Sequence, residues 1–112
     1  MEIIRHGAIE KDLRSLKRFP APLASLVAWE RLFCLKGMRE TPGIEHFPGL
    51  GVGNIFKARV VPLKENCGKS KGFRLIFRLI NNASCQILVF TRHGIYQSEH
   101  DLIRLIKERI IS

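Results

Sequence analysis

The stretch from Lys57 to Arg92 constrains the fold more than any other part of this sequence. Apolar and charged residues alternate over 55–61 and again over 73–79, which is the two-residue period of half-buried β-strands. A connection rich in Gly and Lys joins these runs, and a third run, 86–92, follows a turn at Asn81-Asn82. The pattern predicts three consecutive strands of a twisted antiparallel sheet.

Positive charge is concentrated on this predicted sheet. Seven Lys or Arg residues and one acid lie between Lys57 and Arg78, a net of +6 out of +9 for the chain. Alternation places Phe73, Leu75 and Phe77 toward the core and Ile76 on the open face, together with the basic side chains of Lys57, Arg59, Arg74, Arg78 and Arg92. Such a face favours nucleic acid, an anionic membrane surface or an acidic protein as the partner.

Helical patterns precede and follow the strands. Residues 8–19 carry a narrow apolar stripe, and a more broadly apolar helix is expected over Leu23–Lys36, ending at Gly37. Because Pro residues lie between them, these helices should form an antiparallel hairpin. Ser98 and Asp101 resemble a capping box that begins a C-terminal helix with Arg104, Lys107 and Arg109 outside its apolar stripe.

The remaining segments complete a single domain over residues 1–112. Residues 1–5 fit a short strand and 39–53 a loop, which gives the element order β-α-α-β-β-β-α. With helices on one face of an antiparallel sheet, this order predicts an α+β fold in two layers. The Gly-rich 49–53 and Gly68-Lys69-Ser70 lack the strand–turn–helix context of nucleotide-binding motifs.

The sequence also carries expectations about location and cofactors. The three cysteines lack a Cys-x-x-Cys pair, and the histidines lack metal-ligand spacing, so neither a metal nor another cofactor is expected. Acids among the first residues and the absence of a long apolar run predict neither a signal peptide nor a membrane span. A cytoplasmic location is therefore expected.

Three passages carry a resemblance to a known family. They are MEIIRHGAIEKDLRSL at the start, FKARVVPLKENCGKSKGFRLIFR over 56–78, and ILVFTRHGIYQSEHDLIRLIKERI near the end. The middle passage is the most specific, with a strand bearing a basic pair, a Gly/Lys loop and a Gly-aromatic-Arg strand. Together the three resemble the RelE/ParE superfamily of bacterial and archaeal toxins from toxin–antitoxin modules, with a RelE-like fold.

The resemblance implies an endoribonuclease that cuts mRNA in the ribosomal A site and is held inactive by a cognate acidic antitoxin. The RNA's own 2′-hydroxyl attacks the adjacent phosphate, so the site needs positive charge, a base and an acid. By the same resemblance, Arg74 is a phosphate clamp, Lys57 and Arg59 are the basic pair, and Arg92 is a further basic position. His93 is a candidate general acid because histidine titrates near neutral pH.

Further residues complete the expected site. Tyr96 is expected to stack on a base or donate a proton, and the RNA-backbone contacts are expected from Lys64, Lys69, Lys71 and Arg78. Structural roles compete with these assignments: an ion pair for Arg74, a surface position for His93, packing for Tyr96 and a solvated loop for the lysines. Two other functions stay open, a gyrase inhibitor of the ParE type and a non-catalytic RNA- or ribosome-binding relative.

Overall fold

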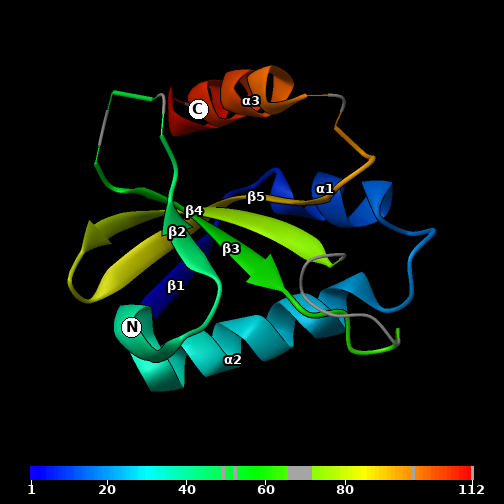
Figure 1. The fold of residues 1–112 in the computed structure, drawn as a ribbon, viewed down its shortest axis with the longest axis horizontal. Helices are drawn as coiled ribbons and strands as arrows, with labels where there is room; N and C mark the ends of the chain where they lie inside the picture. The colour runs from blue at the N-terminus through cyan, green and yellow to red at the C-terminus, as the bar shows by residue number, and fades with distance from the viewer. Residues whose placement is uncertain (49, 52, 66–71, 97, 112) are drawn as a thin grey trace.

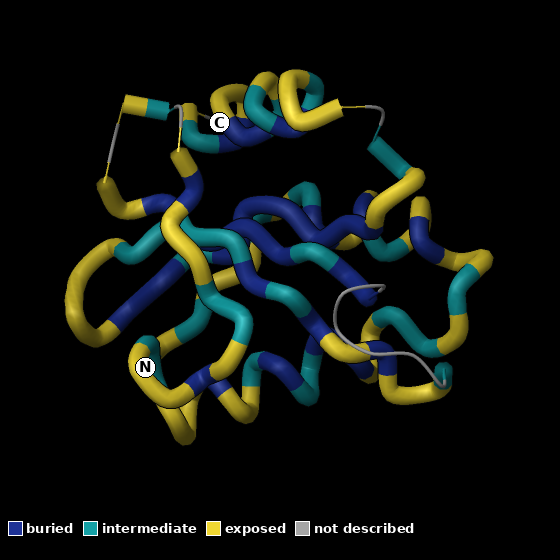
Figure 2. Tube along the Cα trace, viewed as in Figure 1, coloured by how far each residue is buried: buried dark blue, intermediate teal, exposed yellow. Residues whose placement is uncertain are grey.

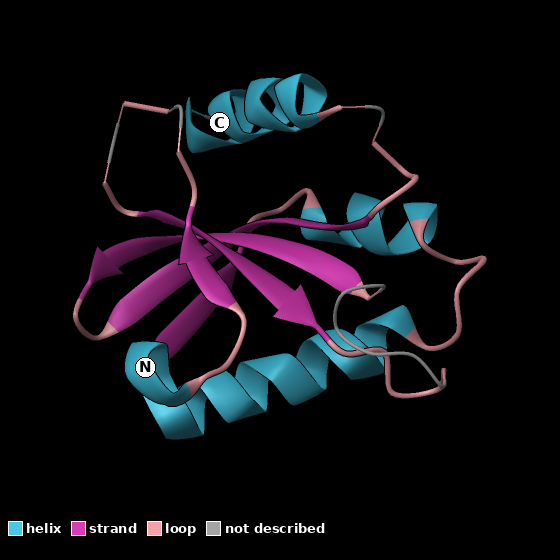
Figure 3. Ribbon diagram, in the orientation of Figure 1, coloured by secondary structure: helices cyan, strands magenta, loops and turns pink. Residues whose placement is uncertain are grey.

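A mixed β-sheet lies at the centre of the chain. The computed structural model describes residues 1–48, 50–51, 53–65, 72–96 and 98–111, and within them five strands form one sheet in the order β1-β5-β4-β3-β2 (Figures 1 and 3). The strands are β1 (Glu2–Arg5), β2 (Ile44–His46), β3 (Ile55–Val60), β4 (Phe73–Asn81) and β5 (Ser84–Arg92). The α+β class predicted from the sequence is confirmed.

The predicted core of the sheet, β3-β4-β5, is antiparallel throughout. Asn81 pairs with Ser84, so the turn is centred on Asn82 and Ala83, one residue later than expected. The Asn81 side chain stabilises it by accepting a hydrogen bond from the Ala83 N–H at 2.7 Å.

Two expectations for the sheet are wrong. β1 runs parallel to β5, so the sheet is mixed rather than antiparallel. Its four residues carry no signal for the direction of pairing, because the partner strand lies about eighty residues away in the chain. β2 also lies inside the expected loop of residues 39–53, where its three residues are too short to show a period.

Three described helices accompany the sheet: α1 (Ile9–Ser15), α2 (Pro22–Glu40) and α3 (Glu99–Ile111). The chain turns back between α1 and α2, as predicted (Figure 1). Gly37 interrupts α2 with φ 75°, and a short extra turn follows that interruption. The Ser98 hydroxyl accepts a hydrogen bond from the Asp101 N–H at 3.2 Å, which confirms the predicted start of α3. None of the described helices is both long and apolar enough to cross a membrane.

The helices cover both faces of the sheet, so the expected two-layer arrangement is wrong (Figures 1 and 2). On one face, Leu26, Trp29 and Phe33 of α2 pack with core residues of β3, β4 and β5 such as Leu75 and Phe77. On the other face, α3 contributes Leu102 and Ile106 to a second cluster that also contains Phe47, Ile55, Ile76, Leu88 and Val89. The face expected to be open is thus partly a second core, because Ile55, Ile76 and Val89 supply an apolar strip for α3.

A buried ion pair joins α1, β5 and α3. The Arg109 guanidinium donates to both carboxylate oxygens of Asp12, at 2.6 and 2.7 Å, and to the Leu88 carbonyl at 2.8 Å. The same carboxylate accepts the Phe90 N–H at 2.9 Å. The expectation that Arg109 lies outside the apolar stripe is therefore wrong, because it follows Leu102 and Ile106 at helical spacing and reaches inward.

Candidate nucleic-acid interface

Three basic side chains lie together on the α3 face of the sheet, and we call them the basic strip: Lys57, Arg59 and Arg74. Arg59 is directly opposite Arg74 in the β3–β4 ladder, and Lys57 is opposite Ile76. All three are half-buried. Like charges directly opposite each other destabilise a sheet, so this placement favours a bound anion that compensates for the repulsion.

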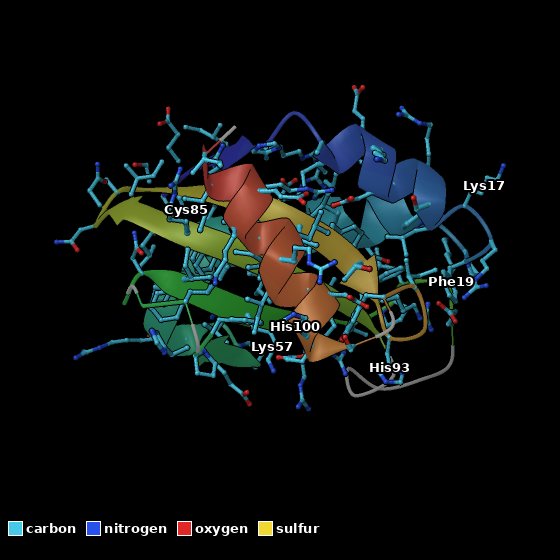
Figure 4. The ribbon with its side chains drawn as sticks, turned by 90° about the horizontal axis from the view of Figure 1, so that it is seen from above. Lys17, Phe19, Lys57, Cys85, His93 and His100 are labelled. Atoms are coloured by element: carbon cyan, nitrogen blue, oxygen red, sulfur yellow. The ribbon has the colours of Figure 1, made fainter. Side chains whose placement is uncertain are left out.

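The basic strip lies beside α3 rather than on an open face. Ile76 is fully buried, contrary to the expectation that it lies on the open face, because α3 packs over it. Seen from the α3 side, Lys57 lies near the N-terminal half of that helix and His93 lies beyond its start, while Cys85 lies toward the opposite end (Figure 4). The strip is therefore part of a surface bounded by the first turn of α3.

Lys57 and Arg59 differ from Arg74 in the contacts that the structure describes for their side chains. Among the described residues, the side chains of Lys57 and Arg59 form neither a hydrogen bond nor an ion pair, and the buried Arg59 Nε has no partner. Glu45 is opposite Lys57 on β2 but is exposed and forms no ion pair with it. Arg74 donates to the Gly72 carbonyl at 3.3 Å and has further interactions within the protein.

Tyr96 adjoins the strip, and His93 adjoins Tyr96. Burial raises the pKa of the Tyr96 phenol above its ordinary value of 10.0; the Arg74 charge opposes this shift and Glu99 adds to it. The ring of exposed His93 lies edge-on to the half-buried Tyr96 ring, with 6.2 Å between their centroids. Tyr96 thus keeps its proton close to a guanidinium, and His93 is accessible from solvent.

Arg92 is not part of this surface, which corrects the expectation that it shares a face with Arg74. Ile76 pairs with Val89 but Phe77 pairs with Ile87, so Leu88 is an extra residue in β5. Such a bulge reverses the alternation beyond it. Arg92 consequently pairs with Phe73 and lies on the α2 face.

On the α2 face, Arg92 is held by an acid and by aromatic rings. Its guanidinium donates to both Glu65 oxygens, at 2.5 and 2.9 Å, and lies 4.2 Å from the Phe19 ring centroid and 5.0 Å from that of Phe73. The hydrogen bond from Arg92 lowers the pKa of the Glu65 carboxyl. These contacts give Arg92 a structural role at the base of the 61–65 segment.

The residues expected to bind the RNA backbone are separated. Arg78 shares the face of the basic strip, but buried Ile76 lies between it and Arg74, and it donates to the Gln86 side chain at 2.8 Å. Lys64 is exposed. Lys69 and Lys71 lie outside the described residues.

Thr91 was missed by the sequence interpretation and belongs to this surface. It pairs with Arg74 across β4–β5 and is 7% exposed. Its position follows only once the extra residue in β5 is included, because an unbroken alternation places it on the α2 face. A hydroxyl at this position adds a neutral donor and acceptor beside the Arg74 backbone.

Within the described part of the chain, no group of three or more His, Cys, Asp or Glu side chains is arranged to hold a metal ion. Comparison of this chain with protein-family models, with curated proteins and with solved structures finds no match.

Proposed function

We propose that this chain is an endoribonuclease that cleaves mRNA in the ribosomal A site and acts as the toxin of a toxin–antitoxin module. The observation that carries the proposal is the basic strip, in which Arg59 and Arg74 lie directly opposite each other with Lys57 on the same face. The likeness of residues 56–78 to RelE-type toxins supports the choice of RNA over other polyanions.

The reaction begins when the 2′-hydroxyl of the RNA attacks the adjacent phosphorus. The O2′–P bond forms, the bond to the 5′-oxygen of the next nucleotide breaks, and a 2′,3′-cyclic phosphate remains. Arg74 and Arg59 stabilise the charge that develops on the non-bridging oxygens. Lys57, on the same face of the sheet, is the candidate base that takes the proton of the 2′-hydroxyl.

The leaving 5′-oxygen needs a proton, and Tyr96 is the best placed donor. Burial raises the pKa of its phenol, so the group is protonated at neutral pH, and its position beside Arg74 sets it near the phosphate. His93 is the alternative donor from the solvent side. Arg92 has no part in this mechanism, because Glu65 and the Phe19 ring hold it on the other face.

A cognate antitoxin is the second partner in the proposal. An acidic segment laid over the basic strip neutralises it and blocks access of RNA. Exposed apolar side chains on α2 offer a separate contact area: Leu23 is 49% exposed and Leu35 is 79% exposed. Co-purification with a small acidic protein encoded beside this chain tests that partner.

The experiment for the activity uses purified chain, ribosomes programmed with a defined mRNA, and the Mg²⁺ that intact ribosomes require. We expect cleavage only on ribosomes, with products that end in a 2′,3′-cyclic phosphate, and loss of cleavage in Arg74→Ala. The matched control is Arg31→Ala, which removes an exposed arginine from α2 on the other side of the sheet. If the chain cleaves no mRNA but inhibits supercoiling by gyrase, the ParE-type function replaces this proposal. If the chain binds ribosomes without cleaving mRNA, the non-catalytic function replaces it.

A further inference from the structure

β1 lies at one edge of the sheet, and its outer side is unpaired. The N–H groups of Glu2 and His6 donate to backbone carbonyls on the β5 side, at 2.7 and 2.9 Å. Successive residues of a strand direct their backbone groups to opposite sides, so Ile3 and Arg5 direct theirs away from β5. In the described part of the chain no strand lies on that side, and these outward groups have no hydrogen-bond partner.

Apart from its short length, β1 has little protection against pairing with another strand. Exposed edges are usually protected by charge, by proline or by a covering segment. The charge on this edge, Arg5, is compensated within the chain, because its guanidinium donates to both oxygens of Glu30, at 2.6 and 2.8 Å. Ile4, between the two outward-directed residues, is 44% exposed. The edge thus combines free backbone donors and acceptors with exposed apolar surface.

A groove of about 930 Å³ between β1 and α2 continues this apolar surface. Most of its lining is apolar and comes from Ile3 of β1 and from Val27, Cys34 and Leu35 of α2. Its charged lining residues are Arg31 and the Arg5–Glu30 pair. Leu35 is 79% exposed. A partner that pairs with β1 therefore also covers an apolar part of α2.

We propose that a second copy of this chain binds here, with its β1 antiparallel to the first across a two-fold axis. Directly opposite residues in an antiparallel ladder direct their backbone groups alike, so an outward-directed residue must face an outward-directed one. Three central registers meet this condition: they set Ile3 opposite Ile3, Ile4 opposite Ile4, or Arg5 opposite Arg5. The Arg5 register opposes like charges, which destabilise a sheet, and the Ile3 register sets Ile4 against the charged Glu2.

The register centred on Ile4 is the one with complementary pairs. It sets the exposed Ile4 side chains of the two copies against each other and places Glu2 opposite His6 of the second copy. The outward groups of Ile3 bond with those of Arg5 of the second copy. The axis keeps both α2 helices on one face of the joined sheet, so the two grooves adjoin and Leu35 lies at the interface. Leu35 thus contacts the second copy in the free chain and the antitoxin in the complex.

A cysteine pair tests the register. Ile4→Cys is made in a chain that carries Cys34→Ser and Cys67→Ser and keeps the buried Cys85. In the proposed register the two copies of position 4 form a non-hydrogen-bonded pair with about 4.5 Å between Cα atoms, a distance that a disulfide spans. We expect oxidised glutathione, which is reduced as the disulfide forms, to convert most of this variant to a covalent dimer.

Glu2→Cys in the same background is the matched control. Position 2 is exposed on the same face of β1, but its two copies lie about 14 Å apart along the strands, at about 3.4 Å per residue. This variant should therefore stay monomeric in oxidised glutathione. Equal cross-linking of the two variants, or none in Ile4→Cys, overturns the proposal.

Sedimentation of the wild type measures the dimer without a cross-link. Each copy has a net charge of +9, so association should strengthen as salt screens the repulsion. Ile4→Lys sets two cations opposite each other and should weaken association at least about tenfold. Val61→Lys adds the same charge at a 49% exposed position beyond the end of β3 and should leave association unchanged. A wild type that is monomeric at about 1 mM, or equal weakening by both variants, overturns the proposal.

Discussion

Arg74 on β4 and Arg92 on β5 belong to neighbouring residue pairs of the same ladder. Their surroundings nevertheless differ. Arg74 faces another arginine across the ladder, whereas Arg92 lies among Phe19, Phe73 and Glu65. A guanidinium stacked on rings and bound to both oxygens of a carboxylate is stabilised where it lies. The surroundings of Arg74 favour a bound phosphate, whereas those of Arg92 stabilise the folded protein.

The Glu65–Arg92 pair makes stability depend on pH. Arg92 lowers the pKa of Glu65 below 4.5, so the pair stabilises the fold above that pH, and this contribution is lost as the pH falls through the lowered value. We expect the urea midpoint of the wild type to fall more steeply below pH 4.5 than that of Glu65→Gln. If the urea midpoints of the two proteins fall equally with pH, the Glu65–Arg92 pair contributes nothing to stability.

Cys34 and Cys85 should differ sharply in reactivity. Burial raises the pKa of the Cys85 thiol to about 11, with nearby Cys34 and Glu30 adding to the shift, while Cys34 is exposed. Because the thiolate is the reactive form, iodoacetamide at about pH 8 should modify Cys34 in the native protein and Cys85 only after unfolding in urea. Site-resolved mass spectrometry measures both; equal native rates would contradict the burial of Cys85.

At the scale of secondary-structure elements, Asp12 connects α1 with β5 and α3. It accepts hydrogen bonds from Phe90 of β5 and Arg109 of α3, so Asp12→Ala leaves a buried cation without its partner. We expect a loss of about 3–5 kcal/mol in the free energy of unfolding, measured in urea. Glu10→Ala, at an exposed position of the same helix, is the control and should change stability by less than about 0.5 kcal/mol.

Substitution of both partners tests the origin of that loss. The double variant Asp12→Leu, Arg109→Met should recover part of the stability, since no unpaired charge is then buried. Recovery should be incomplete because the Phe90 N–H still loses its acceptor. A double variant no better than Asp12→Ala would mean that packing, rather than the unpaired charge, dominates.

Period-two alternation located β3 and β4 and placed Lys57, Arg59 and Arg74 on one face, because each strand is regular over at least six residues. It misplaced Arg92 because one extra residue at Leu88 reverses every later side chain and leaves no mark in the sequence. Arg109 was placed outside the apolar stripe of its helix because it is charged, and Asp12 was assigned no role. The available signal was positional, since each lies next to the apolar stripe of its helix.

At the scale of the molecule, the basic strip and the exposed leucines of α2 are separated by the sheet. The basic strip lies on the α3 face, while exposed leucines line α2 on the other face. Two partners, one anionic and one apolar, can thus be bound on different sides. This separation is compatible with an RNA substrate and a protein partner that covers more than the active site.

Salt dependence measures how much of RNA binding comes from the strip. Three phosphate contacts with single-stranded RNA predict a slope of about −2 for the logarithm of affinity against the logarithm of salt, at about −0.7 per contact. Arg74→Ala should make the slope shallower by about 0.7, and Arg31→Ala should leave it unchanged. Equal effects of the two variants in fluorescence anisotropy would mean that binding follows net charge rather than this surface.

The central claim is that Arg74 acts in cleavage of mRNA. The most direct measurement maps mRNA 5′-ends in bacteria after induced expression of the wild type, Arg74→Ala and Arg31→Ala. We predict new ends within coding regions for the wild type and Arg31→Ala, and a loss of about 10²-fold or more for Arg74→Ala at an unchanged urea midpoint. New ends at wild-type levels in Arg74→Ala, or none in the wild type, would contradict the account.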